Sequence, residues 1–500
     1  MTSEQQPPQQ AADLGVRATR GAIRAVAAQG ALALLQICSV VVLARLLQPA
    51  DFGLYAMVFS VVGVAYLFRD LGLSAAAIQA EHLTRQQQSN LFWANTGLGA
   101  AGAALCLASA PLLGFFYGNA AVVPIAAALA CTFVMAGIAT QWRAGLVRNM
   151  QFGRIAVGEV AAAVAGFGSG IAGAVMGWGP WALVAQQVVG GFFGMVIMGV
   201  AAAWLPMRYR RSEPMRDLYR FGGTMFASQV LTYVAAESGA VILGRLFGPY
   251  SVGLFNRATQ TVRTAINQIR TPLWQVAFTT LARIQNDDAR FMRYMLRGQT
   301  IVCIPILAVT GGVAAAAGPL TEVVLGAQWR AAAPFIAMIA VGEGINSLAS
   351  IAGWIFTARG LGRQLLVLTV VTTIVRVSAM LVASSCGALG VVAAFAAAPI
   401  LLFPVSLWWA GRVSRLATGG LIVKALWILL IAAVPAAVTT VVVAVIGPHA
   451  NAYLVLAAAI VTHLAGFGLL MVFGRVRREY GEIWFTLRRA MRRKEAHGAQ

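Results

Sequence analysis

The chain has 500 residues, of which 59% are hydrophobic and 11% are charged, and its mean hydropathy is +0.77. A soluble core cannot enclose that much apolar surface, so the composition excludes a water-soluble globular protein and indicates one that spans a membrane. A net charge of +21 would suggest nucleic-acid binding in a soluble protein. In a membrane protein it sets orientation and contacts anionic lipids, so no nucleic-acid partner is expected.

Apolar runs, taken in chain order, predict about fourteen membrane-spanning helices. The first six ranges are 28–47, 53–77, 91–117, 121–141, 156–177 and 180–205. After a basic, proline-containing break come 220–247, 250–282, 298–318, 331–357, 364–383 and 388–410, followed by 421–446 and 452–474. The ten-residue alternation of a transmembrane strand is not seen, so the predicted class is an all-α polytopic membrane protein.

The sequence contains an internal repeat. Residues 41–55 recur at 241–255 with seven of fifteen positions identical. Because six helices separate the copies, both should enter the membrane in the same orientation, as two lobes related by an axis along the membrane normal. The predicted domains are an N-terminal lobe (1–205), a C-terminal lobe (206–411), two extra helices (412–474) and a basic amphipathic tail (475–500).

Basic residues outside the predicted helices fall on alternate connections, with Arg330 as an exception. The connection after the sixth helix, for example, carries Arg208, Arg210 and Arg211. The positive-inside rule then places both termini in the cytoplasm.

Polar residues form a stripe along the range 250–282. A charge at the centre of a membrane helix costs about 2.5 to 3.5 kcal/mol, so each one needs a reason. Steps of four, three, four and three residues separate the members of the stripe, which are Asn256, Gln260, Arg263, Asn267 and Arg270. This spacing predicts that they share one helix face, directed into the bundle or a water-filled cavity. The stripe continues to Trp274, with Arg257 beside it and Arg376 in a later helix. The candidate cavity residues are Arg257, Arg263, Arg270, Arg376, Asn256, Gln260 and Asn267.

Three acids also lie within predicted helices: Glu159, Glu237 and Glu343. They are candidates for ion coupling or for pairing with the arginines. If the acids pair with the arginines, the arginines have a structural role in joining helices. Four embedded arginines against two deeply embedded acids leave a positive surplus, which favours an anionic, phosphate-bearing ligand.

No catalytic or metal-binding set is visible in the sequence. The four histidines are scattered, and the five cysteines show no C-x-x-C spacing and are interpreted as packing residues. We therefore expect no enzymatic activity, no metal and no cofactor.

Three ordered motifs resemble a known family. They are LARLLQPADFGLY with its continuation to residue 95, WGPWALVAQQ at 178–187, and ILGRLFGPYSVGLFNRATQ at 242–260. They resemble the polysaccharide (oligosaccharide) flippase family of the multidrug/oligosaccharidyl-lipid/polysaccharide exporter superfamily, whose members serve lipopolysaccharide and exopolysaccharide biosynthesis.

The resemblance implies a bacterial inner-membrane protein that moves a polyprenyl-diphosphate-linked oligosaccharide from the cytoplasmic to the periplasmic leaflet by alternating access of two lobes. Its implied partners are this lipid, membrane lipids and other polysaccharide assembly proteins, and its last two helices are expected to form a lateral groove for the prenyl tail. Members often carry an Asp where this chain has Gly239, and the nearest acid, Glu237, lies on a different helix face.

Three alternative functions remain. The cationic stripe and the two extra helices argue against a drug/cation antiporter. Short outward connections without a catalytic set argue against a polysaccharide polymerase or ligase. A peptidoglycan-precursor flippase of the same superfamily stays open.

Overall fold

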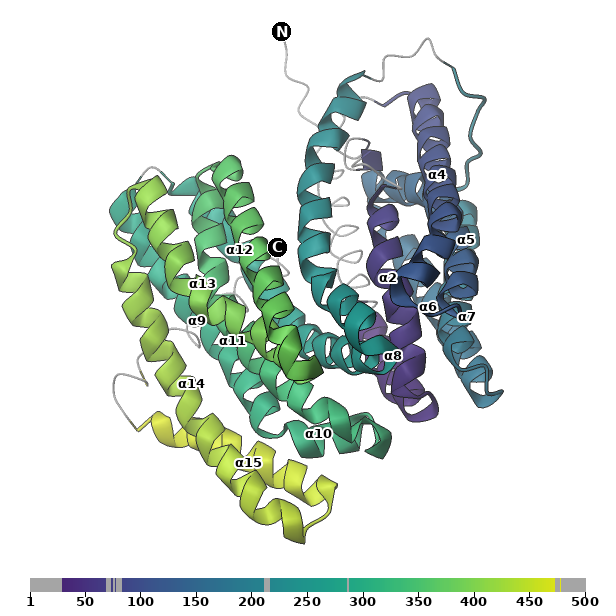
Figure 1. The fold of residues 1–500 in the computed structure, drawn as a ribbon. Coiled ribbons are helices and arrows are strands. Elements are labelled where there is room, and N and C mark those ends of the chain that lie inside the picture. The colour runs from purple at the N-terminus through teal and green to yellow at the C-terminus, as the bar shows by residue number, and fades with distance from the viewer. Residues whose placement is uncertain are drawn as a thin grey trace, which may run out of the picture. The chain divides into compact units, whose positions relative to one another are not determined.

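The structure is a computed structural model that describes residues 29–68, 73–74, 77, 83–210, 216–285, 287–472 and 477. Within these residues every regular element is a helix, and Figure 1 shows their course. The predicted tail at 475–500 lies almost entirely outside the described residues. Contacts divide the chain into two compact units, residues 1–237 and 238–500. The lobe boundaries predicted at 205 and 411 stay a prediction.

The first unit is built from long helices. They are Gln29–Leu46, α2 (Pro49–Phe68), α4 (Arg85–Tyr117), α5 (Val122–Arg148), α6 (Phe152–Val175) and α7 (Pro180–Ala202). The long element α8 (Arg216–Arg283) contributes its first part to this unit and its remainder to the second.

The second unit continues with helices of similar length. They are α9 (Asp288–Ala315), the short α10 (Ala317–Val324), α11 (Ala333–Ala358), α12 (Gly362–Ala383), α13 (Gly387–Ser414), α14 (Gly419–Ile446) and α15 (Ala452–Leu470). Three short 3₁₀ turns join some of them: Ala327–Ala332, Ser384–Cys386 and Gly447–His449.

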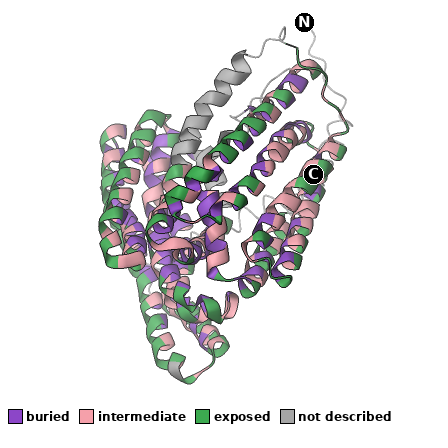
Figure 2. Cartoon of the chain, turned by 45° about the vertical axis from the view of Figure 1, so that its right-hand side comes forward, coloured by how far each residue is buried: buried purple, intermediate pink, exposed green. Residues whose placement is uncertain are grey.

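Ten helical stretches in the described residues are long and apolar enough to cross a membrane, and one of them, Gly362–Ser414, holds both α12 and α13. Many large apolar side chains along these helices are exposed, such as Leu401, Val441 and Leu464, and Figure 2 shows exposed and buried positions alternating along single helices. These faces suit contact with lipid. The all-α polytopic membrane class is confirmed, and the number fourteen stays a prediction.

Several boundaries differ from the apolar-run prediction, and two of them show why. Helix α4 begins at Arg85, six residues before the predicted 91, because Thr84 and Gln87 form a reciprocal capping box. Helix α5 continues past the predicted 141 to Arg148. Helix ends are thus set by capping and basic residues that an apolar scan leaves out.

The internal repeat is visible in the backbone and in burial. The first copy breaks just before Pro49, where α2 begins, and the second breaks at Gly248, which has a positive φ of 76° inside α8. Glycine suits this left-handed conformation because it has no Cβ. Residues 41–46 and 241–246 also share one burial pattern, two half-buried positions, two buried and two exposed.

Glycines allow α4 and α5 to cross very closely. A Cβ on Gly99 would lie 2.6 Å from the backbone oxygen of Phe133, and one on Gly137 would lie 2.5 Å from that of Asn95. In membranes, where lipid tails are as apolar as the side chains, such small-residue contacts are a main source of helix association.

In the second unit, segments that are far apart in the sequence pack against one another. Gln299 on α9 is fully buried and its side-chain amide donates a 3.1 Å hydrogen bond to the carbonyl oxygen of Leu421 on α14, across 122 residues of chain. Helices α11 and α13 meet where a Cβ on Gly342 would lie 2.6 Å from the Cα of Ala396.

Candidate functional site

An ion pair joins the second segment of α8 to α11. Arg263 Nε donates to Glu343 Oε1 over 2.8 Å, and the two side chains are 31% and 9% exposed. Asn346 Nδ2 donates to the other carboxylate oxygen over 3.3 Å. The pair couples the polar stripe to the second unit's core.

Arg376 on α12 lies within electrostatic range of the same carboxylate. It interacts electrostatically with both Glu343 and Arg263, and its guanidinium carbon lies 5.2 Å from the centre of the Phe395 ring, within cation–π range. One arginine is therefore paired with the acid and a second lies within electrostatic range of it, so this cluster carries a net positive charge.

The polar stripe is the more exposed side of its helix. Asn256 and Gln260 are half-buried, Asn267 and Arg270 are exposed, and Arg270 donates a 2.8 Å hydrogen bond to Asn267 Oδ1. The other side is buried through Phe255, Val262 and Ile266. Arg257, beside the stripe, is buried. The side chain of Trp274 lies outside the described residues.

The three acids predicted from the sequence do not lie together. Glu343 meets the stripe, whereas Glu159 on α6 accepts from Arg143 on α5 over 3.1 Å at an exposed position of the first unit. Glu237 belongs to the first unit as well, where it is half-buried and interacts electrostatically with Tyr117 and Tyr233. The structure brings one of the three acids to the stripe.

Gly239, the position singled out in the sequence, packs against an aromatic ring. A Cβ there would lie 2.6 Å from the ring of Phe255, which packs edge-on against Phe395 with ring centres 5.3 Å apart. A side chain at this position would therefore collide with the Phe255 ring unless that ring moved.

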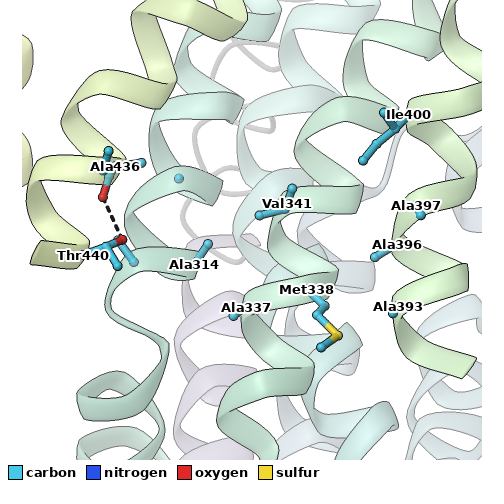
Figure 3. Close-up of a pocket in the computed structure, with 13 residues that line it drawn as sticks. Ala314, Ala337, Met338, Val341, Ala393, Ala396, Ala397, Ile400, Ala436 and Thr440 are labelled. Carbon is cyan, nitrogen blue, oxygen red and sulfur yellow. Dashed lines mark hydrogen bonds between the residues drawn. The ribbon is translucent and has the colours of Figure 1, made fainter. Parts of the chain in front are cut away.

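An apolar pocket of about 520 Å³ lies among α9, α11, α13 and α14. Figure 3 shows small side chains from these helices facing it, with the Thr440 hydroxyl turned back to the carbonyl oxygen of Ala436. Its walls include Gly311, Ala314, Ala337, Val341, Ala396, Ala437 and Thr440. Such walls fit an alkyl or isoprenoid chain. In the part of the chain that the structure describes, no three His, Cys, Asp or Glu gather as metal ligands.

The chain is similar to known proteins over much of its length. The family of polysaccharide biosynthesis proteins matches residues 42–334. The teichuronic acid biosynthesis protein TuaB of Bacillus subtilis (strain 168) is 24% identical over 59% of this chain and 62% of its own length. The lipopolysaccharide biosynthesis protein WzxC of Escherichia coli (strain K12) is 22% identical over 65% and 66%, respectively. The chain thus spans slightly under two thirds of the length of these relatives.

Two solved structures share the fold. The lipid II flippase MurJ in an inward closed conformation has a TM-score of 0.70, with 11% identity over 90% of this chain and 99% of that chain. An inward-facing multidrug resistance MATE transporter of the MOP superfamily has a TM-score of 0.61, with 14% identity over 77% of this chain and 94% of that chain.

Proposed function

Because the chain belongs to the family of polysaccharide biosynthesis proteins, we propose that it is a flippase for a polyprenyl-diphosphate-linked oligosaccharide. The lipid moves from the cytoplasmic to the periplasmic leaflet of the bacterial inner membrane by alternating access, and the protein serves surface or exopolysaccharide biosynthesis without performing catalysis itself.

The cluster of Arg263, Arg376 and Glu343 carries this proposal. A net positive charge inside a membrane protein is tolerated when water or an anion is close by, and guanidinium groups offer paired donors to phosphate oxygens. The exposed Arg270 extends the stripe by two turns. The diphosphate is the anion that fits, and Asn256, Gln260 and Asn267 supply neutral hydrogen bonds for sugar hydroxyls.

The apolar pockets of the second unit support a path for the prenyl tail. One pocket has Ala436, Ala437 and Thr440 of α14 in its wall. A second, of about 290 Å³, lies among α9, α10 and α15. The two helices expected to form a lateral groove therefore each line an apolar pocket.

A second candidate is a flippase for the peptidoglycan precursor, which the fold shared with the MurJ structure favours. A cationic drug is disfavoured, since the arginine cluster would repel it.

The proposal is tested by depleting the protein in its host and measuring lipid-linked oligosaccharide in each leaflet. Full repeat units trapped on the cytoplasmic side, and released when the wild-type chain is restored, are the expected result. Single units accumulating on the periplasmic side would indicate a polymerase or ligase. Trapped peptidoglycan precursor would favour the second candidate, and no lipid-linked accumulation would refute both.

The orientation is testable with a native thiol. Cys386, which we interpreted from sequence as a packing residue, is exposed in the turn between α12 and α13, on a connection predicted to be periplasmic. A membrane-impermeant maleimide should label intact spheroplasts at Cys386, and Cys386→Ser should remove that label. Labelling that requires lysis would reverse the predicted topology and place both termini outside.

A further inference from the structure

One ionisable side chain lies within a membrane helix and outside the arginine cluster. His463 on α15 is 8% exposed. Its Nε2 lies 2.8 Å from the carbonyl oxygen of Ala308 on α9, and its Nδ1 lies 3.2 Å from the hydroxyl of Thr439 on α14. An ionisable group at this depth is expensive, so its presence calls for a function.

Proton counting defines two states of this contact. The Ala308 oxygen can only accept, so Nε2 carries a proton in both. The Thr439 hydroxyl has one proton and lies 2.7 Å from the carbonyl oxygen of Pro435. If the Thr439 hydroxyl donates its proton to the Pro435 oxygen, Nδ1 must donate to the Thr439 oxygen, and the imidazole then carries two protons and a positive charge. If the ring is neutral, the hydroxyl turns to Nδ1 and the bond to Pro435 is lost.

Two further neighbours lie against the imidazole. Phe467, one turn along α15, places its ring centre 5.2 Å from that of His463 at 76°, in range of a cation–π contact. Gly312 on α9 makes the room, since a Cβ there would lie 3.0 Å from the imidazole.

Among the described residues that line the pocket around His463, none is charged. Titratable groups on the helices that pack against α15 have other partners. Cys303 of α9 donates to the carbonyl oxygen of Ser347 on α11, and Glu322 of α10 pairs with Arg330. Lys424 lies four turns before Thr439 on α14. The described wall of that pocket therefore holds no other positive charge that would repel a protonated His463.

We propose that His463 is a proton-binding site whose occupation ties α15 to α9 and α14. The bound proton makes the two bonds that join His463 to Ala308 and Thr439 charge-assisted, and it also lets the Thr439 hydroxyl keep its hydrogen bond to Pro435 within α14. The ring also forms part of the wall of the α9–α10–α15 pocket, so proton binding fixes that wall. The inference concerns the resting protein and does not depend on the identity of the cargo.

The test is hydrogen–deuterium exchange of the full chain in detergent at pD about 5.5 and about 8, on either side of the range in which histidine titrates. After correction for intrinsic rates, amides of α15 and the second half of α14 should exchange about fivefold more slowly at the lower pD, the factor of one net hydrogen bond.

Two variants and a control isolate the proton. His463→Gln keeps a donor for Ala308 and an acceptor for Thr439 but cannot gain charge, so its pD response should vanish. Thr439→Val, of nearly equal shape, should reduce the response. The matched control His449→Gln changes an exposed histidine and should respond like the wild type. A wild type without a response, or a full response in either His463→Gln or Thr439→Val, overturns the proposal.

Discussion

Exchanging the charges of the Arg263–Glu343 pair is expected to leave a folded protein that has lost most of its transport. The variant Arg263→Glu with Glu343→Arg keeps one acid and one base at the contact, so the bond between α8 and α11 survives. It moves the guanidinium away from the stripe, and a phosphate loses a charge-assisted contact worth about 1.5 to 3 kcal/mol. Release of trapped lipid-linked oligosaccharide should fall by about ten- to a hundredfold.

The single variant Arg263→Ala is the necessary comparison. It leaves the largely buried Glu343 without its ion-pair partner, with the hydrogen bond from Asn346 still in place, and should cost about 2 kcal/mol of stability after allowing for the partial exposure of Arg263. If the exchanged pair restores both folding and transport to wild-type levels, Arg263 is a strut and the cationic-cluster proposal is wrong.

A single methyl group at Gly99 is expected to loosen the first unit. The new Cβ of Gly99→Ala would meet the backbone oxygen of Phe133 at 2.6 Å, and a backbone atom cannot turn away as a side chain can. The α4–α5 crossing must widen, at a cost of about 1 to 3 kcal/mol. Unfolding by SDS titration in mixed micelles measures this loss of free energy.

Gly97, two residues earlier on α4, provides the control. A Cβ there meets nothing within 4 Å, so Gly97→Ala should be neutral or stabilise the helix by about 0.5 to 1 kcal/mol. Equal losses for both variants would show that the close crossing contributes nothing to stability.

Much of the fold was readable from sequence because a bilayer demands long apolar segments. Each predicted range overlaps a helix, and the break at Gly248 follows from the Gly-Pro pair in the repeated block. The Thr84 capping box was readable too, as a Thr with Gln three residues later, but an apolar scan passes over it. The short α10 was missed because eight residues are too few to give a clear apolar run.

The site was predicted only in part. Spacing identified the stripe on α8, since it depends on one helix. That Glu343 pairs with Arg263 and lies within electrostatic range of Arg376, while Glu159 turns to Arg143, depends on how separate helices pack, and the sequence does not encode this locally. His463 was dismissed as one scattered histidine for the same reason, because its partners come from two other helices.

The hydrogen bond from Gln299 to Leu421 has a consequence for biosynthesis. In the first unit the tightest contacts join consecutive helices, α4 with α5 and α6 with α7, so each hairpin is complete soon after the ribosome has made it. In the second unit α9 cannot complete its contact with α14 until Leu421 has been synthesised, 122 residues after Gln299. Until then the buried amide of Gln299 lacks its native partner. The nascent chain therefore assembles its first half as it is inserted and its second half only near the end of translation.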